Sequence, residues 1–216
     1  MMTWTENVII GDANYIDRVA FDLTVNFERM IGRRIPPADM SRWVECIALD
    51  GGMRPSAPAA AGDASPVSSP AAATRVVLIH DAARRRLENF APSDYAGELD
   101  GQAFTGPLGE FLFTCVSPED VATREVLFLE TLQLALQAKE VRRLMVIPDG
   151  QAIDDVRRVV RQTDDSDAPK RITVFTMQPV SGGQFAQEML GYSLMAALGV
   201  KSSELERICP EEGTAL

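Results

Sequence analysis

Hydrophobic residues in this chain occur in short continuous runs, each followed by a stretch in which they recur every three or four positions. The runs lie at residues 8–10, 75–81, 110–116, 142–149 and 171–177. Uninterrupted apolar runs are typical of strands buried on both faces, and spacing of three and four residues is typical of an amphipathic helix. Their alternation predicts a three-layer αβα fold of Rossmann-like type, with a mostly parallel sheet of about five strands.

The first helical pattern, at residues 15–32, is the clearest. Ile16, Val19, Leu23 and Phe27 share one face, and Gly32 predicts the end of the helix. Further helices are predicted at about 37–50, 82–90, 117–139, 152–162 and 181–199. The helix that begins at Ser117-Pro118 is apolar nearly all round, so we expect it to be deeply buried or covered by a partner.

Residues 53–74 interrupt the pattern with alanine, proline, serine and glycine and almost no large side chain. Such a segment buries too little apolar surface to offset the entropy of ordering it, so we predict a flexible insertion. Because the alternation of strands and helices resumes directly afterwards, residues 1–216 are predicted to form a single α/β domain that contains this insertion.

Composition narrows the classes of function. The formal net charge is −10, which disfavours an extended nucleic-acid surface. The three cysteines are widely spaced, and the single histidine argues against a Ser-His-Asp triad or a histidine-rich metal site. The sequence shows neither a signal-peptide pattern nor a run of apolar residues long enough to cross a membrane. We therefore expect a cytoplasmic protein without a membrane partner.

Acidic residues follow four of the predicted strands, namely Asp12, Asp81, Asp120 and Asp149. Parallel strands end at the same edge of a sheet, where ligands of α/β folds bind, and carboxylates are preferred ligands of Mg²⁺. On this hypothesis Asp12, Asp120 and Asp149 hold Mg²⁺ or Mn²⁺, and Asp12, Asp81 and Asp149 are catalytic. Aspartate is also a common helix cap and turn residue, so the same pattern is compatible with structural roles.

The loop at residues 178–185 contains Gly182 and Gly183 ahead of the last predicted helix. Free backbone amides at such a position can bind phosphate, so these two glycines are a candidate anion-binding loop. The loop matches neither of the common phosphate-binding glycine motifs, and a flexible connection that caps the helix is the alternative.

Two stretches of the chain resemble known protein families. The segment VIIGDANYIDRVAFDLTVNFERMIGRRIP, together with WVECIALDGG, resembles the opening of a family of functionally uncharacterised proteins from Bacteroidetes, most specifically over residues 8–52. That resemblance implies a bacterial cytoplasmic protein and supplies no activity.

The second resemblance is architectural, to nucleases of the PIN/NYN class. Those proteins have an aspartate after the first strand, as Asp12 is here, and a later strand that ends in acids before a helix, as in LMVIPDGQAIDD. The NYN pattern places two acids two residues apart before an aromatic residue. In this chain Gln151 stands two residues after Asp149, and no aromatic residue follows.

The sequence thus leaves three hypotheses. The first in order of preference is a homo-oligomer or an interaction protein that binds a protein partner. The alternative is a divalent-metal-dependent phosphoester hydrolase or nuclease that uses the acids at the strand ends. The third is a nucleotide-binding regulator that uses the Gly182-Gly183 loop.

Overall fold

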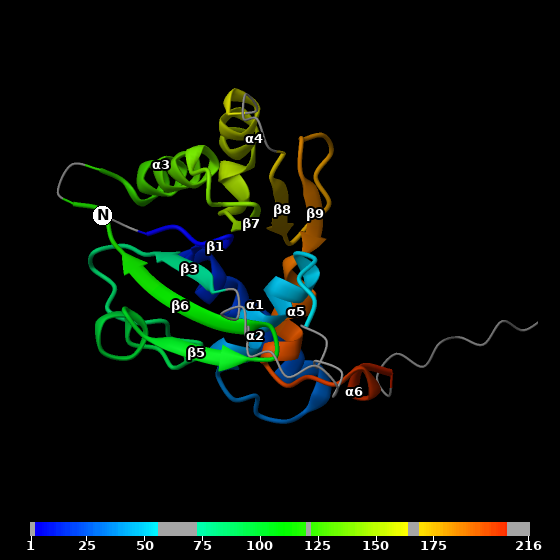
Figure 1. Ribbon diagram of the computed structural model, residues 1–216. Helices are drawn as coiled ribbons and strands as arrows, with labels where there is room; N and C mark the ends of the chain where they lie inside the picture. The colour runs from blue at the N-terminus through cyan, green and yellow to red at the C-terminus, as the bar shows by residue number, and fades with distance from the viewer. Residues whose placement is uncertain (1–2, 56–72, 120–121, 164–168, 207–216) are drawn as a thin grey trace, which may run out of the picture.

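A seven-stranded sheet forms the centre of the protein (Figure 1). The computed structural model describes residues 3–55, 73–119, 122–163 and 169–206. In sheet order the strands are β5 (Ala103–Gly106), β6 (Gly109–Val116), β3 (Thr74–Ile79), β1 (Asn7–Asp12), β7 (Arg143–Ile147), β8 (Arg171–Thr176) and β9 (Ala186–Met189). All neighbouring strands are parallel except β5 and β6, which form an antiparallel hairpin.

Helices cover both faces of this sheet, so the predicted three-layer α/β fold is confirmed. They are α1 (Ala13–Ile31), α2 (Met40–Asp50), α3 (Arg124–Gln137), α4 (Ile153–Gln162), α5 (Leu190–Ala197) and the short α6 (Ser202–Glu206). In β1, Ile9 packs with α1, α2 and α5, whereas Val8 and Ile10 pack with α3 and α4. Burial on both faces explains why the strands are continuous apolar runs.

The sheet has seven strands where about five were predicted. The two additional strands, β5 and β9, are short edge strands in which exposed and half-buried residues alternate. β9 occupies residues that the sequence assigned to the start of the last helix, which begins only at Leu190. An edge strand is covered on fewer sides than a central one, so it lacks the apolar run by which the other strands were recognised.

Two helix predictions were wrong at the local level. Residues 82–90 form turns that lead to the two-residue strand β4 (Phe90–Ala91), which pairs with β2 (Ala38–Asp39), and a π-helical turn follows at Tyr95–Leu99. Helix α3 begins at Arg124 rather than at Ser117, because Thr123 provides the N-cap and accepts a hydrogen bond from the Val126 N–H group. Both Ser117 and Thr123 are acceptable caps, and the local sequence does not choose between them.

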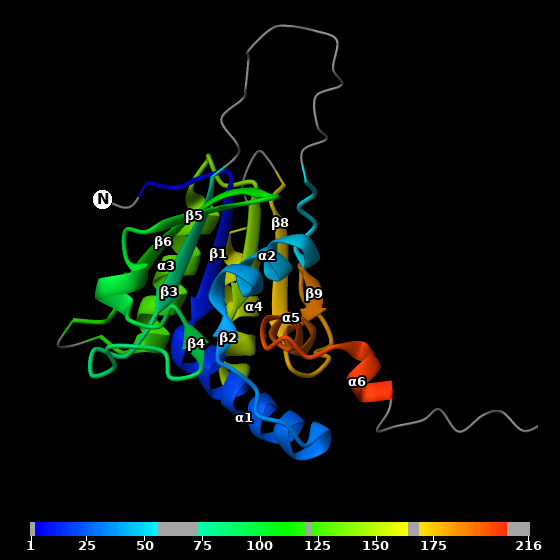
Figure 2. The same cartoon turned by 90° about the horizontal axis from the view of Figure 1, so that it is seen from below.

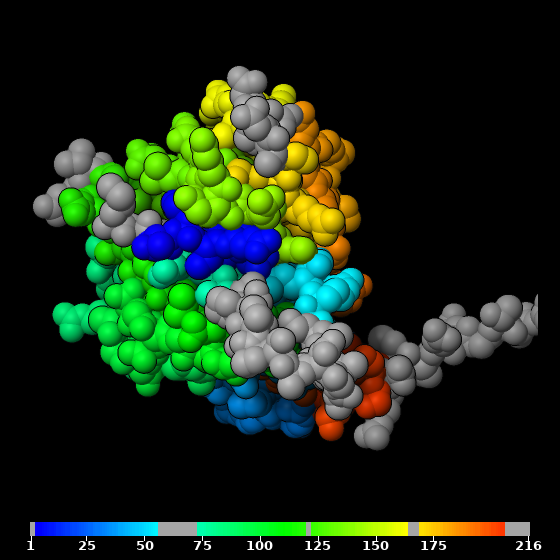
Figure 3. Space-filling view, viewed as in Figure 1, coloured from blue at the N-terminus to red at the C-terminus, as the bar shows by residue number. Residues whose placement is uncertain are grey.

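Within the described residues, no helix is both long and apolar enough to cross a membrane. Most of the predicted insertion, residues 56–72, lies outside the described part of the chain, as does Asp120. In the space-filling view, the N-terminal residues in blue form a band between the yellow-green residues of the α3 layer and the green strands of the hairpin (Figure 3).

The order of the strands places a topological switch point at the carboxyl ends of β1 and β7. These two strands are neighbours in the sheet. The helices α1 and α2 follow β1 on one face, whereas α4 follows β7 on the other. Adjacent strands whose connections leave on opposite faces mark the point where open α/β sheets bind ligands. The carboxyl ends of β1 and β7 are therefore the first candidate for a functional site.

Candidate functional site

Asp12 lies at this switch point as the last residue of β1 and the N-cap of α1. Its Oδ1 accepts a hydrogen bond of 2.9 Å from the Tyr15 N–H group. Its Oδ2 lies 3.0 Å from Nε of Arg124, and only 3% of the side chain is exposed. Asp12 is thus a helix cap and, at the same time, one half of a buried ion pair.

Arg124, the first residue of α3, brings a guanidinium group to the acids at the strand ends. Its Nη1 donates to Oδ2 of Asp81 at 3.1 Å, and its Nη2 donates to Glu125 at 3.1 Å. The side chain is 14% exposed. The contact between Nε and Asp12 is short but lacks hydrogen-bond geometry, so we regard it as an electrostatic contact. One arginine therefore bridges the ends of β1 and β3.

Asn14 strengthens the same bridge from the first turn of α1. Its Nδ2 donates to Oδ2 of Asp81, and its Oδ1 accepts a 3.3 Å hydrogen bond from the Asp81 N–H group. Asp81 is 46% exposed, so it forms the open side of the network. Asp12, Asn14, Asp81 and Arg124 are hereafter called the strand-end network.

Asp149 lies beyond the end of β7 and has different partners. It accepts a hydrogen bond of 3.1 Å from the Gln151 N–H group, and Nη2 of Arg18 donates to it at 3.0 Å. It caps the short 3₁₀ helix Gly150–Ala152. Asp149 is close enough to Asp12 for its charge to act on that carboxyl group.

Burial dominates the electrostatics of Asp12. It raises the pKa of the carboxyl group, because the charged form is poorly solvated in the protein. The Tyr15 N–H group and Arg124 lower this pKa, while Asp149 and Glu125 raise it further. Burial followed by the charge of Asp149 also raises the pKa of Tyr15. The site thus stabilises a buried carboxylate mainly through a backbone amide and one arginine.

The structure places three of the four predicted acids at one edge of the sheet. Asp12 and Asp81 share Arg124, whereas Asp149 pairs with Arg18. Among the residues that the structure describes, no three acidic, histidine or cysteine side chains are grouped so that they could hold a metal ion. The assignments of Asp12, Asp81 and Asp149 as catalytic, and of Asp12, Asp120 and Asp149 as metal ligands, stay predictions.

Sequence reasoning missed Arg124, although one signal was available. The N-terminus of a helix carries partial positive charge, so a cation in the first turn is unfavourable without an anionic partner. A helix that starts at Ser117-Pro118 would instead contain Arg124 in its interior, where the residue carries no such signal. The partners Asp12 and Asp81 are distant in sequence, and only the sheet order brings them to Arg124.

A loop next to the strand-end network carries Arg84, Arg85 and Arg86. Asp17 of α1 anchors this loop by accepting hydrogen bonds of 2.8 Å and 3.1 Å from the backbone N–H group and Nδ2 of Asn89. Arg84 contacts the same carboxylate at 3.4 Å, and Arg86 pairs with Glu88. Together with Glu88 and Asp94, the three arginines line a surface hollow of about 590 Å³.

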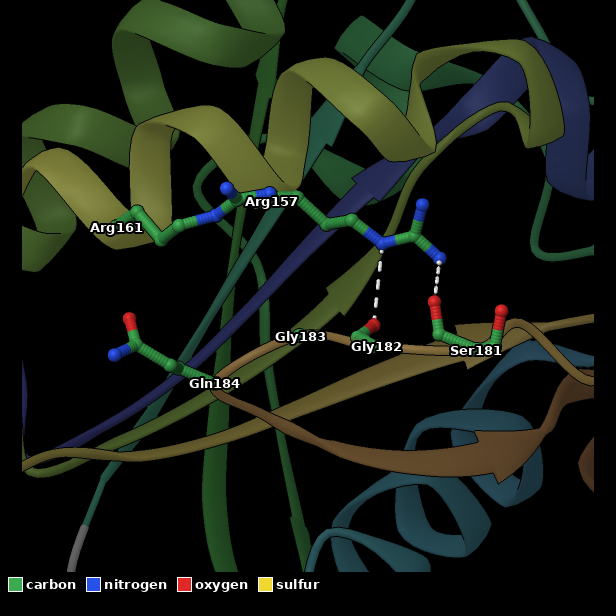
Figure 4. Close-up of a pocket in the computed structure, with 6 residues that line it drawn as sticks. All are labelled: Arg157, Arg161, Ser181, Gly182, Gly183 and Gln184. Carbon is green, nitrogen blue, oxygen red and sulfur yellow. Dashed lines mark hydrogen bonds between the residues drawn. The ribbon is translucent and has the colours of Figure 1, made fainter.

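The predicted anion loop forms a separate, exposed site (Figure 4). Arg157 of α4 donates to the carbonyl oxygens of Gly182 at 3.1 Å and Ser181 at 2.6 Å. Its Nη1 also donates to Asp154 at 2.6 Å. The two glycines have positive φ angles of 77° and 136°. The loop therefore offers carbonyl oxygens to an arginine of the same chain.

The surroundings of this loop differ from the prediction in one respect. Strand β9 follows it rather than a helix, so no helix N-terminus adds its dipole to the glycine amides. Arg161 and Gln184 line the remaining hollow of about 340 Å³. The assignment of Gly182 and Gly183 to an anion-binding loop is not tested by these contacts and stays a prediction.

Comparison with known proteins gives a family and no activity. No curated protein and no solved structure matches the chain. A family model described as a family of unknown function, DUF6621, matches residues 1–205. This match spans both the strand-end network and the Gly182-Gly183 loop, so both sites lie within the region that the family shares. The chain belongs to the family of unknown function DUF6621.

Proposed function

We propose that this protein acts by binding another protein, and that its strand-end network is structural. The observation that carries the proposal is the position of Arg124, whose guanidinium group lies against both Asp12 and Asp81. In a metal-dependent hydrolase this position would belong to a cation with open coordination sites for water and substrate. Here a side chain of the same protein supplies the positive charge.

The energetics of Asp12 support this proposal. The carboxyl group is almost completely buried, so it needs a neighbouring positive charge to remain ionised. Arg124 lowers the pKa of Asp12 and so supplies that charge. A divalent ion would have to displace Arg124 and break its contacts with Asp81 and Glu125 as well.

Exposed apolar side chains support the binding role. Phe21, Val25 and Met30 are 53%, 37% and 44% exposed, and all three belong to α1. Single exposed hydrophobic residues are common on protein surfaces, but several on one helix are typical of an interaction site.

Thermal melting with and without Mg²⁺ or Mn²⁺ tests the proposal. We expect neither ion to raise the melting temperature of the wild-type protein or of Asp12→Asn, because the site already contains its cation. Arg157→Ala, which changes an arginine outside the network, is the matched control. Stabilisation of the wild type by metal that is lost in Asp12→Asn would contradict the proposal, since a ligand stabilises only the state that binds it.

The second candidate function is a divalent-metal-dependent phosphoester hydrolase or nuclease. It is favoured by the position of Asp149, which is close enough to Asp12 to raise its pKa. If Arg124 moved away, Asp12, Asp81 and Asp149 would be left at one edge of the sheet, beside the arginines of residues 84–86. The resemblance to PIN/NYN nucleases belongs to this second candidate.

The variant Arg124→Ala separates the two candidates. The hydrolase candidate predicts that the wild type, with Mn²⁺, cleaves p-nitrophenyl phosphate or single-stranded RNA, and that Asp12→Asn does not. The binding proposal predicts no cleavage by the wild type. Cleavage by Arg124→Ala alone would show that the acids are competent for catalysis and that Arg124 prevents it.

The cellular setting is also part of the proposal. We infer a bacterial cytoplasmic protein, in keeping with the resemblance to Bacteroidetes proteins. Cys46 and Cys115 are free thiols, and burial raises the pKa of Cys115 to about 12. Such thiols suit a reducing compartment. The net charge of −10 supports the expectation that no extended surface binds nucleic acid.

A further inference from the structure

The two halves of α1 have different surroundings. Residues 13–20 are buried with the single exception of Arg18, whereas exposed residues predominate from Phe21 onward. Figure 2 shows that this second half projects beyond the end of the sheet. The outer side of a projecting helix contributes little to the core of its own domain. That side is therefore available to a partner.

The outer side of the projecting half carries exposed apolar residues at its edges. Leu23, Phe27 and Ile31 face inward and pack against the core. Phe21 and Val25, four residues apart, lie along one edge of the exposed side, and Met30 lies at its other edge. The fold of this chain therefore accounts for the inner set of side chains and leaves the outer set without an internal role.

Two opposite charges accompany these residues. Asp22 and Arg29 are exposed and lie two helical turns apart on nearly the same side as Val25. Neither side chain belongs to any of the ion pairs formed among the described residues. Their charges are thus available to groups outside the chain.

This arrangement is self-complementary. Asp22 and Arg29 are equally distant from a point between Val25 and Asn26. When two copies of α1 pack antiparallel about a two-fold axis at that point, Asp22 of each copy faces Arg29 of the other. Phe21 and Met30, nine residues apart, lie at the two opposite edges of this face and flank the charged pairs. A two-fold interface requires a surface that complements itself, and this helix provides one.

We propose that the outer side of α1 binds a second copy of this chain in an antiparallel pair. The inference rests on the proposed binding function and names its partner. A standard interface buries about 800 Å² on each partner, which is more than half a helix offers, so we expect a reversible dimer whose population depends on concentration.

Sedimentation equilibrium over a range of concentrations tests this inference. We expect the wild type to dimerise. Asp22→Arg and Arg29→Asp should each weaken dimerisation by about tenfold or more, because each places like charges opposite one another. The double variant Asp22→Arg/Arg29→Asp restores opposite charges in the same register, so it should dimerise to nearly the same extent as the wild type.

Two further variants serve as the apolar test and the control. Phe21→Ser should weaken the dimer, and Leu134→Ser, at an exposed position of α3, should leave it unchanged. Circular dichroism melting checks that every variant is folded. A wild type that is monomeric at all concentrations, or a double variant that stays monomeric, would overturn the inference. The metal-melting experiment is independent, so failure of the dimer can be distinguished from failure of the proposed function.

Discussion

One arginine in the strand-end network and one beside the Gly182-Gly183 loop each contact three oxygen-bearing groups. Arg124 contacts three carboxylates, one of them almost completely buried. Arg157 contacts two backbone carbonyl groups and one exposed carboxylate at the surface. A buried carboxylate without its partner is strongly destabilising, whereas exposed pairs contribute little. The surroundings of an arginine, more than the number of its contacts, therefore determine how much stability its loss removes.

The largest effect is expected for Arg124→Ala. Removal of the guanidinium leaves the buried carboxylate of Asp12 without its positive neighbour, and we expect the free energy of unfolding to fall by about 2–4 kcal/mol. Urea denaturation measures the change. Arg124→Lys keeps the charge but cannot bridge two carboxylates in the same geometry, so it should recover only part of the loss. If the free energy of unfolding falls by less than about 1 kcal/mol, the cost of burying the Asp12 carboxylate must be offset in another way.

The second prediction concerns the pH dependence of that variant. Burial already raises the pKa of Asp12, and loss of Arg124 removes one of the groups that lower it. A raised pKa in the folded state means that stability is lost as pH rises through that pKa. The difference between Arg124→Ala and the wild type should therefore be larger at about pH 8 than at about pH 5. Urea denaturation at the two pH values measures this difference in the free energy of unfolding. A difference that is larger at the lower pH would contradict the prediction.

A smaller loss is expected at Asp17, which joins α1 to the loop after β3. Asp17→Ala leaves the Asn89 N–H group without its acceptor and removes one of the two acceptors of the Asn89 side-chain amide, so we expect a loss of about 1–3 kcal/mol. The control is Asp155→Ala, which removes a half-exposed carboxylate on α4 that pairs with Arg158. Equal effects of the two variants would show that the loop gains no stability from its buried anchor.

Arg157→Ala should have a smaller effect still on global stability. Its hydrogen bonds are to a surface loop and to the exposed Asp154, so we expect a change of no more than about 1 kcal/mol. The consequence should be local, with faster hydrogen exchange at residues 181–184. A loss as large as that of Arg124→Ala would remove the distinction between the two arginines.

The smallest effect is expected at the pair of Arg33 and Glu204, which joins the end of α1 to α6. Hydrogen bonds from Arg33 lower the pKa of Glu204 to about 2. In Arg33→Ala this pKa should return toward its ordinary value, and an NMR titration follows it directly. The contribution of the pair is present at neutral pH and is lost as pH falls toward the lowered pKa. An unchanged titration would mean that Lys201 rather than Arg33 determines this pKa.

Part of the candidate site could be predicted from the sequence, because Asp12, Asp81 and Asp149 follow recognisable strands. Local patterns could also locate Gly32 as the end of α1, where the structure shows a left-handed residue. The network partners could not be predicted in the same way. Asn14 and Asp81 are separated by 67 residues, and Arg124 and Asp81 by 43.

What the sequence determined by itself is the class of fold, because a strand buried on both faces must be apolar throughout and a covering helix must be apolar on one side. Only the tertiary structure decided three further features, namely the two edge strands, the start of α3 and the contacts of Arg124. Edge strands carry little apolar pattern, Ser117 and Thr123 are both acceptable caps, and a charge pair is defined by distance in space. These three features share one physical reason. Each depends on contacts between groups that are distant in the sequence and come together only when the sheet forms.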